Sequence, residues 1–344
     1  MKFDVGAAPH AAASNGVSRV MGTVLLALLP AAGVHVWLFG PGLLVNILIA
    51  SATAVVAEAA CLRARGRAVA PALSDLSAVL CAVLLAFCLP PLAPWWVTVT
   101  ATAFAIVVAK QIYGGLGANL FNPAMAGYVV ALVSFPEALT RWPSPALDLS
   151  LWESIRPILT GAAGTVGWDA LTSATPLDHM RSELGQMRMM SEILASETAG
   201  RRGGWLTFQI AALVGGGVLL WRRVIRWHLP VATLAGVVFT SGVLNVIDGD
   251  AYASAWFHLS TGSAVFAAFF IVTDPVSAAT SARGRLVFGF TIGVLAVIIR
   301  TFGAYPDGMA FAVLLGNALV PLIDRWTAPQ VYGHGPGDDE TPLT

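Results

Sequence analysis

Residues 42–62 read GLLVNILIASATAVVAEAACL, and this stretch decides what class of protein the chain encodes. It has about 20 residues, the length of helix that crosses the hydrocarbon core of a bilayer, and Glu58 is its one ionisable side chain. The whole chain is 57% hydrophobic and 11% charged, whereas soluble domains are roughly 25% charged. We therefore predict a polytopic membrane protein. Its formal charge of zero gives no reason to expect nucleic acid as a partner.

Apolar segments of this kind recur along the chain and predict an all-α fold with ten transmembrane helices. The segments are 20–39, 42–62, 73–90, 95–113, 123–135, 204–221, 229–247, 256–273, 286–303 and 308–325. The fifth is short and begins at Pro123, directly after the glycine-rich stretch GGLGANLFNP. Short or interrupted helices are often where membrane proteins build a site.

The charges in the connecting segments predict the orientation of the chain. Both termini are placed in the cytoplasm by the cations that gather in alternate connections, namely Lys2, Arg19, Arg63, Arg65, Arg67, Lys110, Arg222, Arg223, Arg226, Arg283, Arg285 and Arg325. The expected parts are a membrane half over 1–135, a periplasmic loop over 136–203 and a membrane half over 204–344. Five helices in each half would make the halves inverted repeats, and NPAMAGYVVAL in the first half weakly resembles YPDGMAFAVLL in the second.

The long loop contains a hydroxyl-rich turn, DALTSATPLD, at residues 169–178. Its Ser-Ala-Thr also occurs at 51–53, inside an apolar segment, so only the surroundings distinguish the two copies. Thr175 is predicted to cap a short amphipathic helix that starts at Pro176, with Asp178 as the acid of a capping-box-like start. A cap hydroxyl contributes roughly 1 kcal/mol and requires no chemistry.

The same position suits a second use. A helix N-terminus favours a bound phosphate, so Thr175 could carry a phosphate ester to a cofactor, with the small Ser173 and Ala174 leaving room. The negative charge of Asp178 argues against a phosphate there. From the residues alone, both interpretations stay open.

The stretch DALTSATPL closely resembles a flavin-attachment motif. The family that carries it includes the D subunit of Rnf electron-transport complexes and the B subunit of the sodium-translocating NADH:quinone reductase. There an aspartate precedes a Ser/Thr-x-Ala-Thr motif, and FMN is joined through its phosphate to the last threonine. The resemblance implies that Asp169 matches the aspartate, that Thr172, Ser173 and Ala174 match the lead-in, and that Thr175 carries covalent FMN. Ser173 is a departure, because many relatives look to have glycine at that position.

The resemblance covers essentially the whole chain and favours the Rnf subunit. It is carried by HAAASNGVSRVMGTVLLALLPA, GGLGANLFNPAMAGYVVALVSFP, TDPVSAATSARGRLVFG and YPDGMAFAVLLGNALVPLID, in this order. It implies a urea-channel-like fold in the bacterial inner membrane, and electron transfer through FMN in a complex that couples ferredoxin and NAD to movement of Na⁺ or H⁺. Such a chain is not catalytic alone. Its implied partners are subunits A, B, C, E and the flavin-carrying G, the lipid bilayer, and a flavin transferase for maturation.

Asn119 and Asn122, just before Pro123, are candidates for a second site. If this segment is broken, their amides would cap the fifth helix, and otherwise they would share a helix face and bond between helices. The family resemblance adds a third interpretation, because paired asparagines match a motif that contacts riboflavin in the quinone-reductase relative.

Ionisable residues near membrane depth are costly and often functional. Glu58 is the deepest and is our candidate for an ion or proton path, whereas Asp274 is expected to end a helix or to pair with Arg283 or Arg285. Cys61, Cys81 and Cys88 lack metal-ligand spacing, so no metal site is expected. The rival function is a channel or small-solute transporter of inverted-repeat fold without a flavin. A scaffolding subunit with a vestigial flavin site is a third alternative, which the intact Thr175 disfavours.

Overall fold

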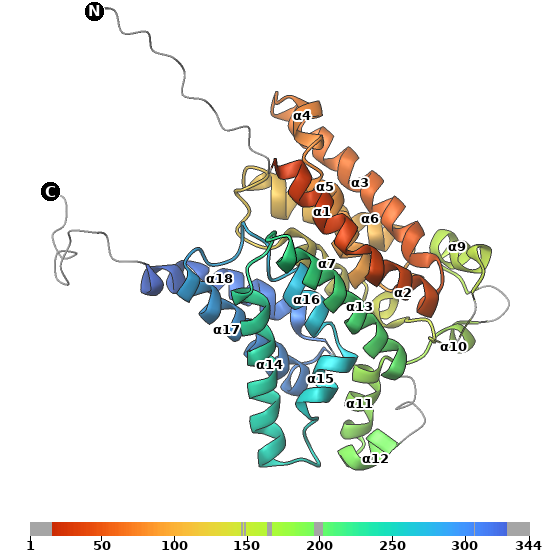
Figure 1. Cartoon of the computed structure of the whole chain (residues 1–344). Helices are drawn as coiled ribbons and strands as arrows, with labels where there is room; N and C mark the ends of the chain where they lie inside the picture. Colours follow the sequence, from red (N-terminus) through yellow and green to blue (C-terminus); the bar gives the residue numbers. More distant parts are fainter. Residues whose placement is uncertain are drawn as a thin grey trace, which may run out of the picture. The chain divides into compact units, whose positions relative to one another are not determined.

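The computed structural model describes residues 16–145, 147, 149–163, 167–195, 202–305 and 307–328. In these ranges the chain is helical, and its one β feature is an isolated antiparallel bridge between Pro143 and Thr172 (Figure 1). The predicted all-α fold is therefore confirmed.

The helices follow the apolar segments closely. In chain order they are α1 (Val17–Ala27), α2 (Leu29–Phe39), α3 (Gly42–Ala64), α4 (Val69–Leu73), α5 (Ser77–Cys88), α6 (Trp95–Phe104), the π-helix η1 (Ala105–Ile112), α7 (Pro123–Ser134), α8 (Pro136–Thr140), α9 (Leu151–Thr160), α10 (Trp168–Leu171), α11 (Pro176–Gly185), α12 (Met190–Ala195), α13 (Arg202–Trp221), α14 (His228–Ile247), α15 (Ala255–Thr261), α16 (Ala264–Phe270), α17 (Ala282–Phe302) and α18 (Met309–Thr327).

Seven helical stretches of the described chain are long and apolar enough to cross a membrane. They are Val17–Phe39, Gly42–Ala64, Trp95–Ile112, Gly203–Trp221, His228–Ile247, Ala282–Phe302 and Met309–Thr327. Two further predicted segments form the shorter apolar helices α5 and α7. These lengths and compositions indicate a multi-pass membrane protein, while the ten-helix count stays a prediction.

The eighth predicted segment, 256–273, is not one continuous helix. It is divided into α15 and α16 at Gly262 and Ser263. A Cβ atom at Gly262 would collide with the guanidinium of Arg300, and the backbone N–H of Ser263 donates to a carboxylate oxygen of Asp307 at 3.1 Å. Side-chain hydrogen bonding therefore replaces helical bonding at this point.

The chain forms two compact units, each assembled from separate stretches. Unit 1 takes its described residues from 1–117, 126–174 and 210–225, and unit 2 takes its own from 118–125, 175–209 and 226–344. The division by topology into 1–135, 136–203 and 204–344 stays a prediction.

In unit 1, α3 lies at the centre and packs against α5, α6 and η1. Its small residues Ala50 and Ala54 are fully buried. Asn46 is also buried, and its amide nitrogen donates to the carbonyls of Pro90 at 3.2 Å and Pro91 at 3.1 Å. Polar side chains inside this unit therefore satisfy backbone groups where neighbouring helices end.

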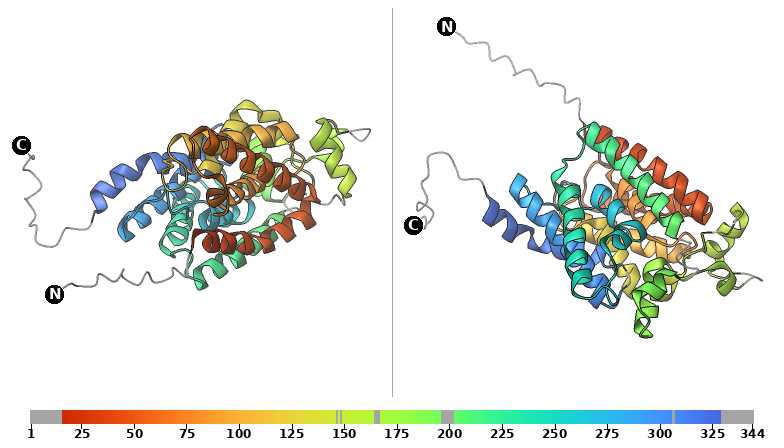
Figure 2. Two further views of the ribbon diagram at one scale, coloured as in Figure 1. Left: turned by 90° about the horizontal axis from the view of Figure 1, so that it is seen from above. Right: turned by 60° about the horizontal axis from the view of Figure 1, so that its bottom comes forward.

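In unit 2, α14 packs along α17, and α17 packs against α18 (Figures 1 and 2). Close approach depends on Gly236 of α14 and Gly293 of α17, because a Cβ atom at either would collide with the backbone of the other helix. Small residues at helix–helix contacts are typical of packing inside membranes, where backbones approach closely.

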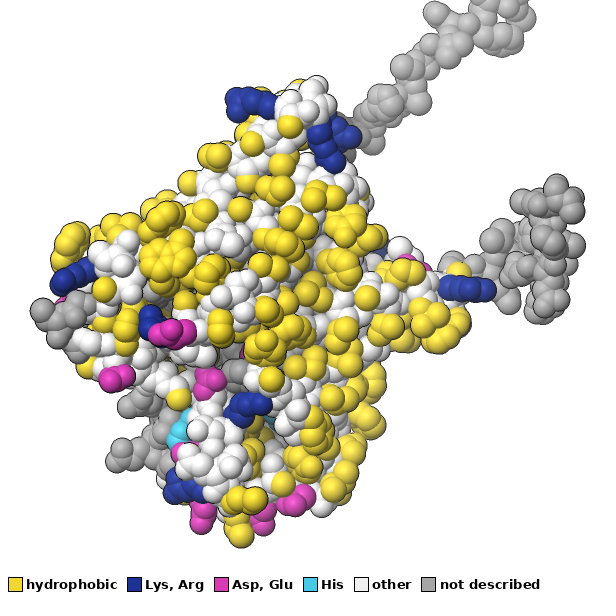
Figure 3. Space-filling model, turned by 180° about the vertical axis from the view of Figure 1, so that it is seen from behind, with side chains coloured by type: hydrophobic (Ala, Val, Ile, Leu, Met, Phe, Trp, Pro, Cys, Tyr) yellow, Lys and Arg dark blue, Asp and Glu magenta, His cyan; other side chains and the backbone are white. Residues whose placement is uncertain are grey.

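Large apolar side chains are exposed on the transmembrane helices. The exposed fraction is 74% for Trp37, 70% for Leu48 and 88% for Val246. Figure 3 shows hydrophobic side chains predominating on the face it draws. Soluble monomers rarely expose apolar patches of this kind, and exposed apolar surface marks contact with membranes or partners. The outer surfaces of these helices are therefore suited to lipid.

Candidate functional site

Thr175 begins the helix of the hydroxyl-rich turn, as predicted. It is the N-cap of α11 with extended backbone geometry, and Pro176 is the first helical residue. Its hydroxyl oxygen accepts from the backbone N–H of Asp178 at 3.2 Å, and the hydroxyl donates to Asp178 Oδ2 at 2.6 Å. The second contact is short, as hydrogen bonds to an ionised carboxylate are.

The carboxylate of Asp178 lies in a half-buried, mixed electrostatic environment. Burial raises its pKa above the usual value, and the nearby Asp307 raises it further, whereas the hydrogen bonds from Thr175 and the charge of Arg181 oppose the rise. Arg181 lies on α11 itself, and its Nη2 donates to the carbonyl of Gly303. Its Nη1 is buried without a hydrogen-bond partner.

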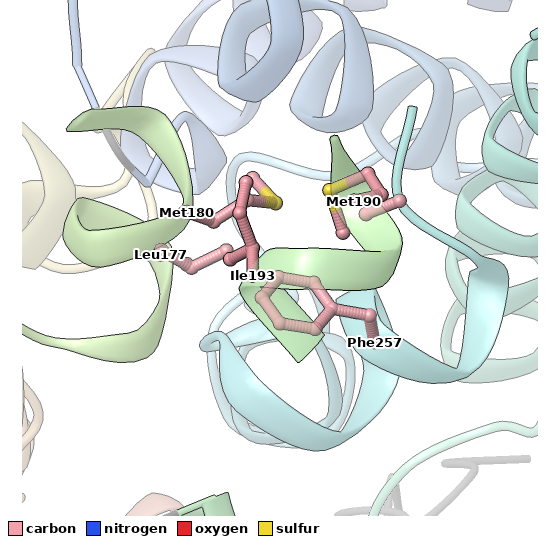
Figure 4. Packing of buried hydrophobic residues seen from close by; sticks show 6 residues of the cluster. Leu177, Met180, Met190, Ile193 and Phe257 are labelled. Atoms are coloured by element: carbon pink, nitrogen blue, oxygen red, sulfur yellow. The ribbon is translucent and has the colours of Figure 1, made fainter. Parts of the chain in front are cut away.

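An apolar cluster fixes α11 and α12 to the rest of unit 2. Leu177 and Met180 of α11 pack with Met190 and Ile193 of α12 and with Phe257 of α15 (Figure 4). The backbone N–H of Met190 also donates to the carbonyl of Asp250 at 2.9 Å. The helix that starts at Thr175 is thus packed against α12 and α15, and α12 is in turn bonded to the backbone at Asp250.

The residues before Thr175 belong to unit 1 and are held by local bonds. The hydroxyl of Thr172 donates to the carbonyl of Trp168 at 2.8 Å, and the backbone N–H of Ser173 donates to the carbonyl of Trp142 at 2.9 Å. Asp169 lies in the first turn of α10, and both Asp169 and Ala174 are exposed. Asp169 falls in unit 1 and Thr175 in unit 2.

The local chemistry fits a phosphodiester at Thr175. Thr175 is half-buried, and the residue before it, Ala174, is small and exposed. The positive charge of Arg181, on the same helix, acts on the carboxylate of Asp178, and its Nη1 is buried without a described hydrogen-bond partner. The opposing feature is Asp178, whose carboxylate would repel a phosphate if it stayed ionised.

Asn119 and Asn122 lie in unit 2, in a non-helical stretch before α7. Asn122 caps α7, since its Oδ1 accepts from the backbone N–H of Met125 at 3.2 Å, and its Nδ2 donates to the carbonyl of Ile271 at 3.2 Å. Its backbone N–H donates to Oδ1 of Asn317 at 2.9 Å. The predicted capping role is confirmed for Asn122.

Asn119 has a different set of contacts. Its amide donates to the carbonyl of Phe121 at 3.1 Å, and its side chain lies near the carboxylate of Asp274. Asp274 lies four residues after the end of α16, accepts from the hydroxyl of Ser277 at 2.7 Å and joins a polar cluster, so its predicted role as a helix end or an arginine partner stays a prediction. We define the amide cluster as Asn119, Asn122, Asp274, Ser277 and Asn317.

A second polar centre lies inside unit 1. Lys110 Nζ donates to Glu58 Oε1 and to the hydroxyl of Ser77, both at 2.7 Å, and Gln111 Nε2 donates to the same Glu58 oxygen at 2.7 Å. Glu58, Lys110 and Gln111 are buried, and Glu58 Oε2 has no hydrogen-bond partner. Lys110 is thus a buried partner of Glu58 rather than a loop cation.

The sequence singled out Glu58 but gave no signal for Gln111, Ser277 or Asn317. Gln111 and Asn317 are distant in sequence from the residues they contact. Ser277 lies three residues after Asp274, but no motif marks it. The cysteines lie in α3 and α5, and Cys81 is buried among apolar neighbours, as packing residues are.

Comparison with known proteins identifies relatives over the whole chain. The profile of the NQR2, RnfD, RnfE family matches residues 4–333. The D subunit of the ion-translocating oxidoreductase complex from Shewanella sediminis is 44% identical over 97% of this chain and 99% of its own length. The protein of the same name from Salmonella typhimurium is 45% identical over 98% of this chain and 100% of its own length. That of Citrobacter koseri is 44% identical over 97% and 100%.

Proposed function

This chain belongs to the NQR2, RnfD, RnfE family, and we propose that it serves as the D-type membrane subunit of an Rnf-type complex and carries FMN covalently at Thr175. A bound flavin would supply one- and two-electron redox chemistry, and the protein would supply its position and its surroundings. We further propose that the complex couples electron transfer between ferredoxin and NAD to the movement of Na⁺ or H⁺, and that this chain lies in the inner membrane.

The observation that carries the flavin proposal is the hydroxyl of Thr175. It starts a helix that is anchored by an apolar cluster, it is partly accessible, and it is hydrogen-bonded to a carboxylate at 2.6 Å. The family motif has its modified threonine at the matching position. Asp169, Thr172, Ser173 and Ala174 would then form the stretch that a flavin transferase reads.

The test is substitution of Thr175 by alanine in a strain that supplies the transferase. We expect the wild-type chain to gain the mass of one FMN and to fluoresce on a denaturing gel, and Thr175→Ala to lose both signals while still inserting in the membrane. Ser150→Ala is the matched control, because Ser150 caps α9 and bonds to an acid three residues later. Flavin on the Thr175→Ala chain would overturn the assignment.

For the amide cluster we propose a second, non-covalent flavin of riboflavin type. Asn119 is the better candidate of the two asparagines, because the side chain of Asn122 is already committed to capping α7 and to the carbonyl of Ile271. Extraction and chromatography of released flavin would test this. Loss of riboflavin from Asn119→Leu, with FMN retained, is the expected result.

For ion coupling we propose that the Glu58–Lys110 pair lies on or beside the path. It is a buried ion pair in a membrane helix, and such residues are rare and usually functional. We also propose that the two halves are inverted repeats of five helices. In support, the second helix of each half packs against the third and fourth, α3 on α5 and α6 and α14 on α16 and α17.

We propose that the partners of this chain are the other subunits of the complex, A, B, C, E and G. A channel without flavin is the alternative, and a dark wild-type band on the denaturing gel would favour it.

A further inference from the structure

Two acids in this chain stand three residues after a capping hydroxyl, but their bonds differ. Glu153 completes a full capping box, since its Oε2 accepts from the backbone N–H of Ser150 at 2.9 Å and from its hydroxyl at 2.6 Å. The side chain of Asp178 is one carbon shorter. Its Oδ2 accepts from the hydroxyl of Thr175 at the same 2.6 Å, and the described bonds give it no bond from the backbone N–H of Thr175. Asp178 is thus a hydrogen-bond acceptor aimed at the oxygen that would react.

The two pairs also differ in environment. Glu153 is exposed, and its bonds from Ser150 lower its pKa. Asp178 is half-buried, and its pKa is raised by burial. A carboxylate that binds its proton more strongly is a better proton acceptor.

Hydroxyl nucleophiles are weak until an adjacent base removes the proton, and the diagnostic geometry is a nucleophile–base contact of about 2.6–3.2 Å. The Thr175–Asp178 distance of 2.6 Å lies within that range. We propose that Asp178 is the general base that accepts the hydroxyl proton of Thr175 when a flavin transferase couples this residue to FMN. This inference rests on the proposed function, since it assumes that Thr175 is the attachment site.

The step balances with a flavin adenine dinucleotide as the donor. Thr175 Oγ forms a bond to the phosphorus that bears the riboflavin group, and the phosphoanhydride bond to the adenylate breaks. Adenosine monophosphate leaves, and the hydroxyl proton goes to Asp178 Oδ2. Nothing is oxidised or reduced in this step.

While it holds the proton, Asp178 is neutral, so it does not repel the phosphate as the ester forms, and it can donate a hydrogen bond toward the new ester. The guanidinium of Arg181 then remains as the positive charge closest in sequence on α11, with one buried nitrogen still unpartnered. The surroundings of Thr175 thus change from one negative charge on Asp178 to one on the phosphodiester.

The experiment measures attachment rates on the full chain. Wild-type protein, made without transferase and purified in detergent, is incubated with the transferase and flavin adenine dinucleotide, and FMN addition is followed by intact mass and in-gel fluorescence. Asp178→Asn keeps the size of the side chain, and it keeps the backbone N–H that donates to the hydroxyl oxygen of Thr175. We expect its initial rate to fall about 100-fold or more, the lower end of a general base's contribution. Glu153→Gln is the matched control and should react at the wild-type rate.

A second measurement separates the base from a structural role. Asp178→Ala also keeps the capping N–H, and we expect added formate to restore part of its rate by supplying a carboxylate. Wild-type rates for Asp178→Asn or Asp178→Ala would overturn the inference while leaving FMN at Thr175 intact. A wild-type chain that gains no FMN, or gains it on another residue by peptide mapping, would overturn the proposed function and this inference together.

Discussion

The buried ion pair in unit 1 leads to a quantitative prediction. In Lys110→Met, the ammonium that donates to Glu58 and Ser77 at 2.7 Å is replaced by an apolar side chain of similar length. The side chains of Lys110 and Glu58 are only 4% and 3% exposed. The carboxylate of Glu58 would keep the amide of Gln111 as a donor but would lose its charge partner. Removal of one member of a buried pair costs about 3–5 kcal/mol, and we expect a loss in the lower part of this range.

A second substitution, at Glu58, should restore the stability that Lys110→Met loses. Replacing a whole buried pair by neutral residues is often neutral or stabilising. In Glu58→Gln combined with Lys110→Met, the side chain at position 58 keeps an oxygen that accepts from Gln111. The double variant should therefore recover most of the stability that Lys110→Met loses, and the two substitutions should be strongly non-additive.

The assay is equilibrium unfolding in mixed micelles of increasing denaturing detergent, followed by far-ultraviolet circular dichroism. The reference is Glu137→Gln, which breaks the pair between Glu137 and Arg141, where the Glu137 side chain is 81% exposed. Exposed pairs of this spacing contribute about 0.3–0.5 kcal/mol. If Lys110→Met loses no more free energy of unfolding than Glu137→Gln, or if the double variant is as unstable as the single one, the argument from burial is wrong.

Three further predictions concern unit 2 and the turn. Phe257→Ala should lower the free energy of unfolding by about 3–5 kcal/mol, as truncation of a buried phenylalanine does, and it should speed proteolysis within α11 and α12. Met187→Ala should change neither quantity, because its side chain is 95% exposed. Gly293→Val should lower thermal stability sharply because its Cβ meets α14 backbone, while Gly217→Val has open space. Because the pKa of Asp178 is raised, its ionisation opposes folding as pH rises. Asp178→Asn should therefore increase the melting temperature at pH 7, and the gain should vanish below the unfolded pKa near 3.8.

Features that depend on neighbours in sequence were predictable. Thr175 was placed correctly as a cap because the pattern of hydroxyl, proline and acid lies within four residues. The long helices follow from apolar runs of membrane length. The break of α7 from the preceding stretch follows from Pro123, which starts the helix, and from the glycines before it.

Features that depend on distant contacts were not predictable. Asn122 meets Asn317 across 195 positions of sequence, and Glu58 meets Lys110 across 52. The split between α15 and α16 depends on Arg300 and Asp307 rather than on the apolar run itself. Hydropathy along the sequence does not identify which distant residues come into contact.

The short bond from Thr175 to Asp178 belongs between these two cases. The spacing of the two residues suggests a capping box, and the structure shows the hydroxyl contact of Asp178, whereas the longer Glu153 reaches both the hydroxyl and the backbone N–H of Ser150. From sequence, Asp178 counted against a phosphate at Thr175. Because its carboxylate is hydrogen-bonded to the hydroxyl, we propose that the same negative charge accepts the hydroxyl proton.

The π-helix η1 has a consequence for how this chain tolerates changes in length. Its wider turns let the adjacent residues Lys110 and Gln111 both reach one oxygen of Glu58. Deleting one residue from 105–112 would favour ordinary α-helical bonding and remove the wide turn, so that only one of the two could still meet Glu58. Single-residue gaps in this stretch among related sequences should therefore coincide with a different residue at position 58, and an engineered deletion should be rescued by neutralising Glu58.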